Sequence, residues 1–232
     1  MPSDPNNQQS ISAKARARRV QQFAHYAEGL GISNAQVLDI GGTVMYWKMN
    51  LQFVPKGIIE RIDIVNLPPR KDVMLEIDSV LLHSFAGNAL NKSTLKQESY
   101  DVVYSNAVIE HVGNLRSQRL MAQNIQALGK YYWIQTPAKS FPIEPHFYFP
   151  FFAYLPLSVR TFLHQHLPLG FMGKEENWLE ARMACEETRL LTQREFHSLF
   201  EKGDIIKERM FGFCKSYIAT NMVDQVSHPT GE

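Results

Sequence analysis

Val-Leu-Asp-Ile-Gly-Gly-Thr-Val-Met-Tyr-Trp, residues 37–47, is an apolar stretch that runs through one acid into two glycines. The β-branched and apolar residues before the glycines predict a buried strand. Glycine lacks a Cβ and tolerates positive φ, so the backbone can turn sharply there and approach a ligand closely. The segment therefore predicts a strand whose end binds a nucleotide-like cofactor.

Residues 100–112, Tyr-Asp-Val-Val-Tyr-Ser-Asn-Ala-Val-Ile-Glu-His-Val, repeat this arrangement. An apolar run again ends in small polar residues, after which we expect a helix that contains Glu110 and His111 in its first turn. In an open parallel sheet, ligands bind beyond the carboxyl ends of the strands. Both segments are therefore expected to open onto one crevice.

Apolar periodicity predicts the remaining elements of an α/β domain. A capping box at Thr192 and Glu195 marks the start of the last helix. The alternation of strands and helices indicates a mostly parallel sheet with right-handed crossovers. The predicted helices are 10–30, 113–128 and 192–202, and the predicted strands are 37–40, 57–67, 81–86, 102–105, 131–135 and an antiparallel edge pair, 205–210 and 214–220.

Residues 137–169 interrupt this pattern. They contain six of the twelve prolines and a run of aromatic residues between 141 and 154, without strand alternation. We interpret residues 137–190 as a cap inserted after the fifth strand. The predicted organisation is an N-terminal helical segment (1–34), a cofactor-binding core (35–136), the cap (137–190), the final helix and edge strands (191–220) and a disordered tail (221–232).

Composition excludes several classes of protein. Twenty-four basic and 23 acidic residues give a net charge of +1, so no strong field favours nucleic acid or an anionic membrane. Cys185 and Cys214 are too few for a disulfide framework or a zinc site, which indicates a reducing compartment. No signal-peptide core lies in residues 1–9, and no apolar run approaches the roughly 20 residues of a membrane span. We expect a cytoplasmic protein that does not bind nucleic acid.

The glycine turn, together with the Glu110-His111 pair after the fourth strand, resembles the class I S-adenosylmethionine-dependent methyltransferases of the small-molecule, methyltransferase-11/23-like type. The resemblance covers residues 37–220. It implies a Rossmann-like, seven-stranded, mostly parallel sheet with helices on both faces and an antiparallel edge strand. It also implies S-adenosyl-L-methionine as cofactor and methyl transfer by in-line displacement to a small acceptor. The aromatic cap favours an apolar or amphipathic acceptor, and membrane contact is the less favoured interpretation.

The resemblance also assigns the first part of the cofactor site. Asp39, Gly41, Gly42 and Thr43 would bind the amino acid end of the cofactor, although the family's usual Gly-x-Gly is Gly-Gly-Thr here. At the end of the second strand, Asn66 would bind the ribose, where the family usually has an acid, and Leu67 would pack on the adenine. Asp63, three residues earlier, is the competing candidate for the ribose.

The remaining cofactor contacts follow the third and fourth strands. Asn88 and Ala89 stand where the family commonly has Gly-Asp-Ala, and Asn88 would accept a hydrogen bond from the adenine amino group. The alternative is an ordinary asparagine in a turn. Asn106 would contact the cofactor or the acceptor.

The candidate catalytic residues are His146, Glu144 and His111. The loop Phe-Pro-Ile-Glu-Pro-His, residues 141–146, follows the fifth strand and would place a carboxylate and an imidazole over the acceptor. His146, with Glu144, would bind the acceptor or remove its proton, whereas His111 acts as a base or orients a neighbour. Purely structural roles are the alternative for these residues. No metal site is predicted.

Two other functions compete with methyl transfer. The first is a non-catalytic protein that binds S-adenosylmethionine and acts as a partner or regulator, which the irregular glycine turn and the amide at Asn66 motivate. The second is a nicotinamide-dependent reductase. It is disfavoured because Gly41-Gly42-Thr43 does not extend to Gly-x-Gly-x-x-Gly and no acid ends the second strand.

Overall fold

The computed structural model describes residues 10–170 and 172–223. The N-terminal nine residues and most of the predicted tail, residues 224–232, lie outside the described part of the chain. The chain forms two compact units. Unit 1 comprises Met1–Ser105, Asn124–Trp133 and Thr220–Glu232, and unit 2 comprises Asn106–Gln123 and Ile134–Ala219.

The strands form one eight-stranded sheet in the order β3-β4-β2-β1-β5-β6-β8-β7. The pairs β1–β2, β1–β5 and β2–β4 are parallel, which confirms the predicted Rossmann-like α/β class. The strands are β1 (Ala35–Ile40), β2 (Ile59–Asn66), β3 (Val73–Ile77), β4 (Val80–Ala86), β5 (Tyr100–Asn106), β6 (Gly129–Pro137), β7 (Asp204–Met210) and β8 (Phe213–Thr220).

Six α-helices and four short 3₁₀ helices occur in the described residues. The long N-terminal helix has the predicted extent, with Ser10 as its N-cap. None of the described helices is long and apolar enough to cross a membrane. The helices are α1 (Ile11–Gly29), α2 (Val44–Asn50), η1 (Leu51–Phe53), η2 (Lys92–Thr94), η3 (Ile109–His111), α3 (Leu115–Leu128), η4 (Phe152–Tyr154), α4 (Leu157–His166), α5 (Trp178–Glu187) and α6 (Gln193–Leu199).

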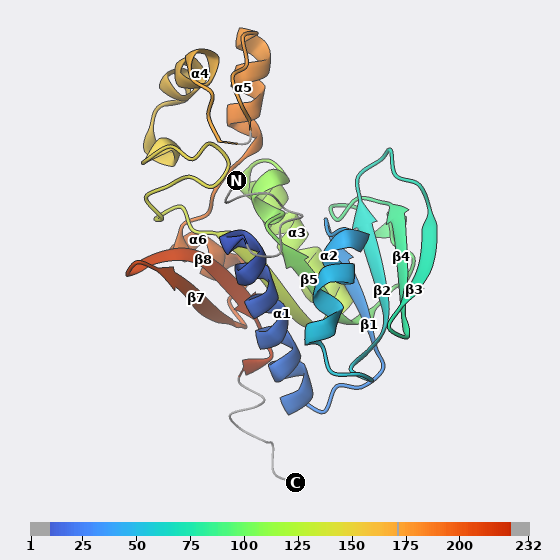
Figure 1. Cartoon of the computed structure of the whole chain (residues 1–232). Coiled ribbons are helices and arrows are strands. Elements are labelled where there is room, and N and C mark those ends of the chain that lie inside the picture. Colours follow the sequence, from blue (N-terminus) through green and yellow to red (C-terminus); the bar gives the residue numbers. More distant parts are fainter. Residues whose placement is uncertain (1–9, 171, 224–232) are drawn as a thin grey trace. The chain divides into compact units, whose positions relative to one another are not determined.

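Unit 1 is packed around fully buried aromatic side chains. Phe23 of α1 meets Tyr104 of β5 and Trp133 of β6 edge-on, with ring centroids 5.5 and 6.0 Å apart. Trp47 of α2 packs on Tyr104 at 5.3 Å. Such edge-to-face pairs add to the stabilisation from apolar burial. Figure 1 shows α1 and α2 beside each other in unit 1, and these aromatic contacts hold both helices on the strands.

The sheet has one strand more than the predicted seven. β3 pairs antiparallel with β4, and Asp78 and Ser79, both at positive φ, form the two-residue turn between them. Positive φ at both central positions is the geometry of a tight hairpin turn. β3 is largely exposed, with Met74 at 56%. It forms an edge strand that the sequence analysis missed, because Asp-Ser is a weak hairpin signal.

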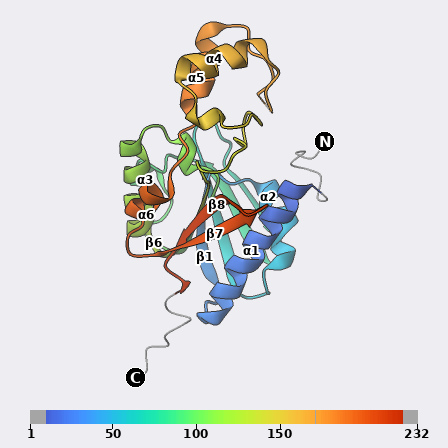
Figure 2. The same ribbon diagram turned by 90° about the vertical axis from the view of Figure 1, so that its left-hand side faces the viewer.

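The opposite edge of the sheet is the hairpin β7–β8. Only Phe211 and Gly212, both at positive φ, join the two strands. A parallel pair would need a long crossover connection, so this pair is antiparallel. Figure 2 shows the two strands side by side. The predicted antiparallel edge is confirmed.

The cap (137–190) lies in unit 2 and contains α4 and α5, which Figure 2 shows packed against each other. Its small core is formed by Phe147, Phe152, Leu169 and Cys185. The rings of Phe147 and Phe152 stack at 4.3 Å. Part of the aromatic run therefore forms the interior of the cap.

One local prediction in unit 2 is wrong. Glu110 and His111 do not lie in the first turn of a helix that follows β5; they belong to the separate 3₁₀ helix η3. Gly113, at φ +100°, separates η3 from α3. The chain breaks there because glycine alone among the residues adopts that conformation without steric cost.

Helix α6 begins with the predicted capping box. Thr192 Oγ1 accepts from the backbone N–H of Glu195, and the Glu195 carboxylate accepts from the backbone N–H of Thr192.

Thr192→Ala should therefore lower the free energy of unfolding by about 1 kcal/mol. Ser198→Ala, on the exposed part of the same helix, is the matched control and should change it by less than about 0.5 kcal/mol. Equal effects of the two variants in urea denaturation would contradict the capping role.

Candidate functional site

The carboxyl ends of the central strands of unit 1 lie next to one another. Ile40 at the end of β1 is opposite Val65 of β2 and Ser105 of β5. Ser105 Oγ donates to the Ile40 carbonyl at 3.0 Å, and the Gly41 N–H donates to the Val65 carbonyl at 2.8 Å. The predicted meeting of these strand ends, at the positions where an open parallel sheet binds ligands, is confirmed.

The two glycines after β1 have different roles. Gly41 lies at φ +77° and makes the turn. A Cβ on Gly42 would lie 1.6 Å from Oδ2 of Asp39, so the carboxylate of Asp39 fills the space that a side chain would need. This packing explains why position 42 is a glycine.

Asp39 is 1% exposed and is held by a hydrogen bond from Nε1 of Trp47 to Oδ2, at 2.7 Å. Burial raises the pKa of this carboxyl to about 7, against the smaller opposing effect of the Trp47 bond. Asp39 therefore supports the turn from beneath. Thr43 is the N-cap of α2, since its Oγ1 accepts from the Tyr46 N–H at 3.0 Å.

Asn66 ends β2 and is tied to the glycine turn. Its Nδ2 donates to the Gly42 carbonyl at 2.9 Å, and Leu67 beside it is 65% exposed. Because the amide nitrogen faces the turn, the amide oxygen is the atom of Asn66 suited to accept from a ligand hydroxyl. Asn66 and Leu67 thus form a polar and an apolar contact next to the turn.

Asp63, the competing candidate, is fully buried within the sheet. Its Oδ1 accepts from Nε of Arg61 at 2.8 Å, and its Oδ2 accepts from the Tyr100 hydroxyl at 2.9 Å. Both oxygens therefore have partners inside unit 1. The geometry favours Asn66 over Asp63 as the ligand contact at the end of β2.

Asn88 and Ala89 belong to a hydrogen-bonded turn. Asn88 Oδ1 accepts from the Leu90 N–H at 2.9 Å, and the Asn88 N–H donates to Thr94 Oγ1 at 2.8 Å. The carbonyl of Ala89 accepts from Asn124 Nδ2 at 2.8 Å. The side-chain oxygen of Asn88 already serves this turn, which corresponds to the structural alternative for this residue.

Unit 2 brings the three candidate catalytic residues together. Nδ1 of His146 lies 2.6 Å from Oε1 of Glu144, and Nε2 of His146 lies 3.1 Å from Nε2 of His111. Glu144 is 4% exposed and its Oε2 accepts from the backbone N–H groups of His146 and Phe147. The loop 141–146 therefore fixes the carboxylate, and the carboxylate fixes the imidazole.

The two imidazoles differ in proton affinity. Burial, with a further contribution from His146, lowers the pKa of His111 to about 4. Burial also opposes protonation of His146, but the Glu144 carboxylate outweighs it and the pKa of His146 is raised. The pair can therefore hold a proton on His146 while His111 is neutral.

A fourth group in unit 2, the side chain of Glu110, belongs to this cluster. It is fully buried, and its Oε2 accepts from Thr136 Oγ1 at 3.0 Å. One ligand atom from each of Glu110, His111 and His146 lies within 4.8 Å of the others. The sequence signal was the adjacent Glu-His pair, but only the fold places it against the loop that carries His146. Asn106, the last residue of β5, is half-buried.

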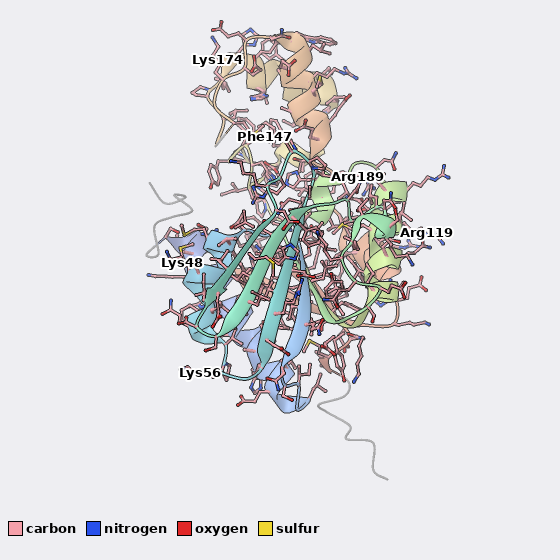
Figure 3. The ribbon with its side chains drawn as sticks, turned by 90° about the vertical axis from the view of Figure 1, so that its right-hand side faces the viewer. Lys48, Lys56, Arg119, Phe147, Lys174 and Arg189 are labelled. Carbon is pink, nitrogen blue, oxygen red and sulfur yellow. The ribbon has the colours of Figure 1, made fainter. Side chains whose placement is uncertain are left out.

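The cap contains a small cavity of about 100 Å³, lined by both apolar and charged side chains. Arg160 donates to the Cys185 carbonyl at 3.0 Å, and Arg189 is paired with Glu195. Figure 3 shows Phe147 among the side chains of the cap, whereas Lys48 and Lys56 lie at the outside of unit 1. The lining consists of Lys139, Glu144, Phe147, Phe152, Ala153, Arg160, Thr188, Arg189 and Leu190.

No known family model matches this sequence, and no protein of curated function matches it. Solved structures with a similar course of the chain include an O-methyltransferase family protein from Burkholderia thailandensis, with 14% identity and a TM-score of 0.47. The matched region covers 92% of this chain and 60% of the Burkholderia chain. PigF with SAH has 13% identity and a TM-score of 0.47, and the matched region covers 89% of this chain and 63% of PigF. The N-methyltransferase NodS from Bradyrhizobium japonicum WM9 has 9% identity and a TM-score of 0.48, and the matched region covers 90% of this chain and 97% of NodS. The chain spans less than two thirds of the length of the first two.

The contact between Asp39 and Gly42 can be tested with a double-mutant cycle. Gly42→Ala should lower the free energy of unfolding by about 1–3 kcal/mol, because the added methyl group collides with the buried carboxylate. Adding Gly42→Ala to Asp39→Ala should cost less than Gly42→Ala costs in the wild type, since the smaller side chain removes the clash. Additive losses in denaturant melts would show that the carboxylate does not fill this space.

The raised pKa of Asp39 predicts a pH dependence of stability. The native state keeps the Asp39 proton up to about pH 7, whereas the unfolded chain releases it near the ordinary value of 3.8. The native state thus binds more protons between these values, so its stability falls as pH rises, by up to about 1.4 kcal/mol per pH unit. Asp39→Asn should remove this part of the slope. Parallel stability profiles of wild type and variant from pH 4 to 8 would contradict the assignment.

Proposed function

We propose that this protein transfers the methyl group of S-adenosyl-L-methionine to a small amphipathic acceptor. The observation that carries the proposal is the Gly41-Gly42 turn at the carboxyl end of β1, beside the ends of β2 and β5. It supports a ligand site that needs close backbone approach, as the resemblance to class I methyltransferases implies. Residues at the ends of β1 and β2 would hold the cofactor, and His146 with Glu144 would contact the acceptor.

The cofactor contacts in unit 1 follow from the polarity of each group. The ammonium of the cofactor's amino acid tail is suited to the glycine turn, because the Asp39 carboxylate lies directly beneath Gly42. A nearby cation favours the ionised form of a carboxyl, so binding would lower the pKa of Asp39. Asn66 would accept from a ribose hydroxyl, and Leu67 would cover the adenine.

The same geometry disfavours a dinucleotide. A pyrophosphate at the turn would place its negative charge near Asp39 and oppose ionisation of that carboxyl group, whereas a cation would favour ionisation. The turn also lacks the third glycine of the dinucleotide motif. A positively charged sulfonium nucleoside is therefore the better ligand.

The cap cavity supports an amphipathic acceptor. Phe147, Phe152 and Leu190 offer apolar contacts, whereas Lys139 and Arg160 offer hydrogen-bond donors and positive charge. His146, oriented by Glu144, would bind the nucleophilic group or take its proton. In the displacement, a lone pair of the acceptor forms the bond to the methyl carbon as the C–S bond breaks, and the sulfur keeps that electron pair. Alignment of the reactants supplies much of the acceleration in such reactions.

Calorimetric titration with S-adenosylmethionine, S-adenosylhomocysteine and NAD tests the proposed cofactor. The two adenosyl compounds should bind with one site per chain, and NAD should not bind at comparable concentrations. Binding of NAD alone would favour the reductase. Binding of the adenosyl compounds without methyl transfer to any of a panel of amphipathic acids, phenols and amines would favour the non-catalytic partner protein.

Replacing His146 tests the role of unit 2. His146→Ala should lower the rate of S-adenosylhomocysteine formation by about 10²–10⁴-fold, the usual contribution of a positioned proton-transfer group. Its affinity for S-adenosylhomocysteine should stay within a factor of about two, because the proposal assigns His146 to the acceptor and not to the cofactor. His197→Ala, at an exposed position on α6, is the control and should keep full activity. Unaltered turnover of His146→Ala would rule out the assignment.

A further inference from the structure

Glu110, His111 and His146 form a compact cluster of potential metal ligands. A proton relay between the two histidines would not require the third group, Glu110. Their three ligand atoms lie within 4.8 Å of one another. The two imidazoles point Nε2 at Nε2 across 3.1 Å, with ring planes at 89°. All three residues belong to unit 2 and come from η3 and the loop 141–146.

The distance between the two imidazole nitrogens matches a coordination site. Imidazole nitrogens bind zinc and similar ions at about 2.0–2.1 Å. Two such ligands at adjacent tetrahedral or octahedral positions are then separated by roughly 3.0–3.4 Å, which includes the distance between the two Nε2 atoms. The acid that completes the group, Glu110, is fully buried.

The surroundings hold the ligands in place. Metal-binding histidines commonly donate their second nitrogen to a carboxylate, which fixes the orientation of the ring. Nδ1 of His146 meets Glu144 Oε1 at 2.6 Å, and Glu144 is itself held by two backbone N–H groups. Thr136 Oγ1 donates to Oε2 of Glu110 at 3.0 Å. This is the outer shell that a metal site with these ligands needs.

We propose that Glu110, His111 and His146 bind one divalent transition metal ion, of the zinc or iron(II) type. Two imidazoles and one carboxylate suit these ions, whereas magnesium and calcium prefer oxygen ligands alone. Three protein ligands leave at least one position open. In so far as the proposed function holds, that position would take an oxygen of the methyl acceptor, and His146 would act as a metal ligand instead of a proton acceptor.

Titration of the chelator-treated protein with Zn²⁺ tests the site directly. The wild type should bind one equivalent, and His111→Ala and His146→Ala should each abolish that binding. Glu110→Gln should weaken it, because it keeps the shape but removes the negative charge. His197→Ala should bind like the wild type, as His197 lies outside the cluster. Near-UV circular dichroism establishes that each variant is folded.

Two further measurements separate a metal site from a histidine pair that shares a proton. Co²⁺ in place of Zn²⁺ should give visible absorption bands that His111→Ala and His146→Ala lack. Glu144→Gln leaves the three ligands in place and should lower Zn²⁺ affinity by about 10–100-fold. Absence of a Zn²⁺ equivalent in the wild type, or wild-type binding by both histidine variants, would overturn the proposal.

Failure of the metal site can be distinguished from failure of the proposed methyltransferase function. Binding of S-adenosylhomocysteine is measured on the same samples with and without Zn²⁺. Nucleoside binding without metal binding overturns the metal site and leaves the methyltransferase proposal intact. Metal binding without nucleoside binding supports the metal site and removes the methyltransferase proposal.

Discussion

The buried carboxylate of Asp39 is the constraint on which the glycine turn at the carboxyl end of β1 depends. It occupies the space that a Cβ on Gly42 would need, and it accepts a hydrogen bond from Trp47, which ties the end of β1 to α2. Trp47 in turn packs on Tyr104 of β5. One acid therefore links the glycine turn to the following helix, and through Trp47 to β5.

The cost of this arrangement is a carboxyl group removed from water, with a pKa raised to about 7. Perturbed pKa values of this kind cluster at functional sites, and structural networks produce them as well. The Gly42 carbonyl is also held by Asn66, so the turn is shaped before any ligand arrives. A preformed turn reduces the entropy that binding must overcome.

Unit 2 shows a second instance of a carboxylate that organises its neighbours. Glu144 is bonded to two backbone N–H groups and to the imidazole of His146, so a loop rich in proline acquires one defined conformation. Glu110 and His111 belong to η3. The backbone N–H of Arg189 donates to the backbone carbonyl of Glu110 at 2.8 Å and so holds η3 in place. Short irregular segments thus carry the candidate catalytic residues, and hydrogen bonds over long sequence separations hold them.

Sequence reasoning predicted the elements that have strong periodicity, including α1, β1, β2, β5, β6 and the capping box of α6. It missed β3 because that strand is exposed and its hairpin turn lacks glycine. The 3₁₀ helix η3 was mistaken for the start of α3 because the two are separated only by a glycine turn. The Glu110–His111–His146 group could not be foreseen as a unit, since residues 35 positions apart in sequence meet only after folding.

Hydrogen–deuterium exchange of the protein with and without S-adenosylhomocysteine tests the central claim, that the strand ends around the Asp39-supported turn form the cofactor site. The account predicts slower exchange at residues 40–44 and 65–67 when the nucleoside is present, with unchanged exchange in the β7–β8 hairpin. Unchanged exchange at both segments under saturating nucleoside, or protection confined to the cap, would contradict it.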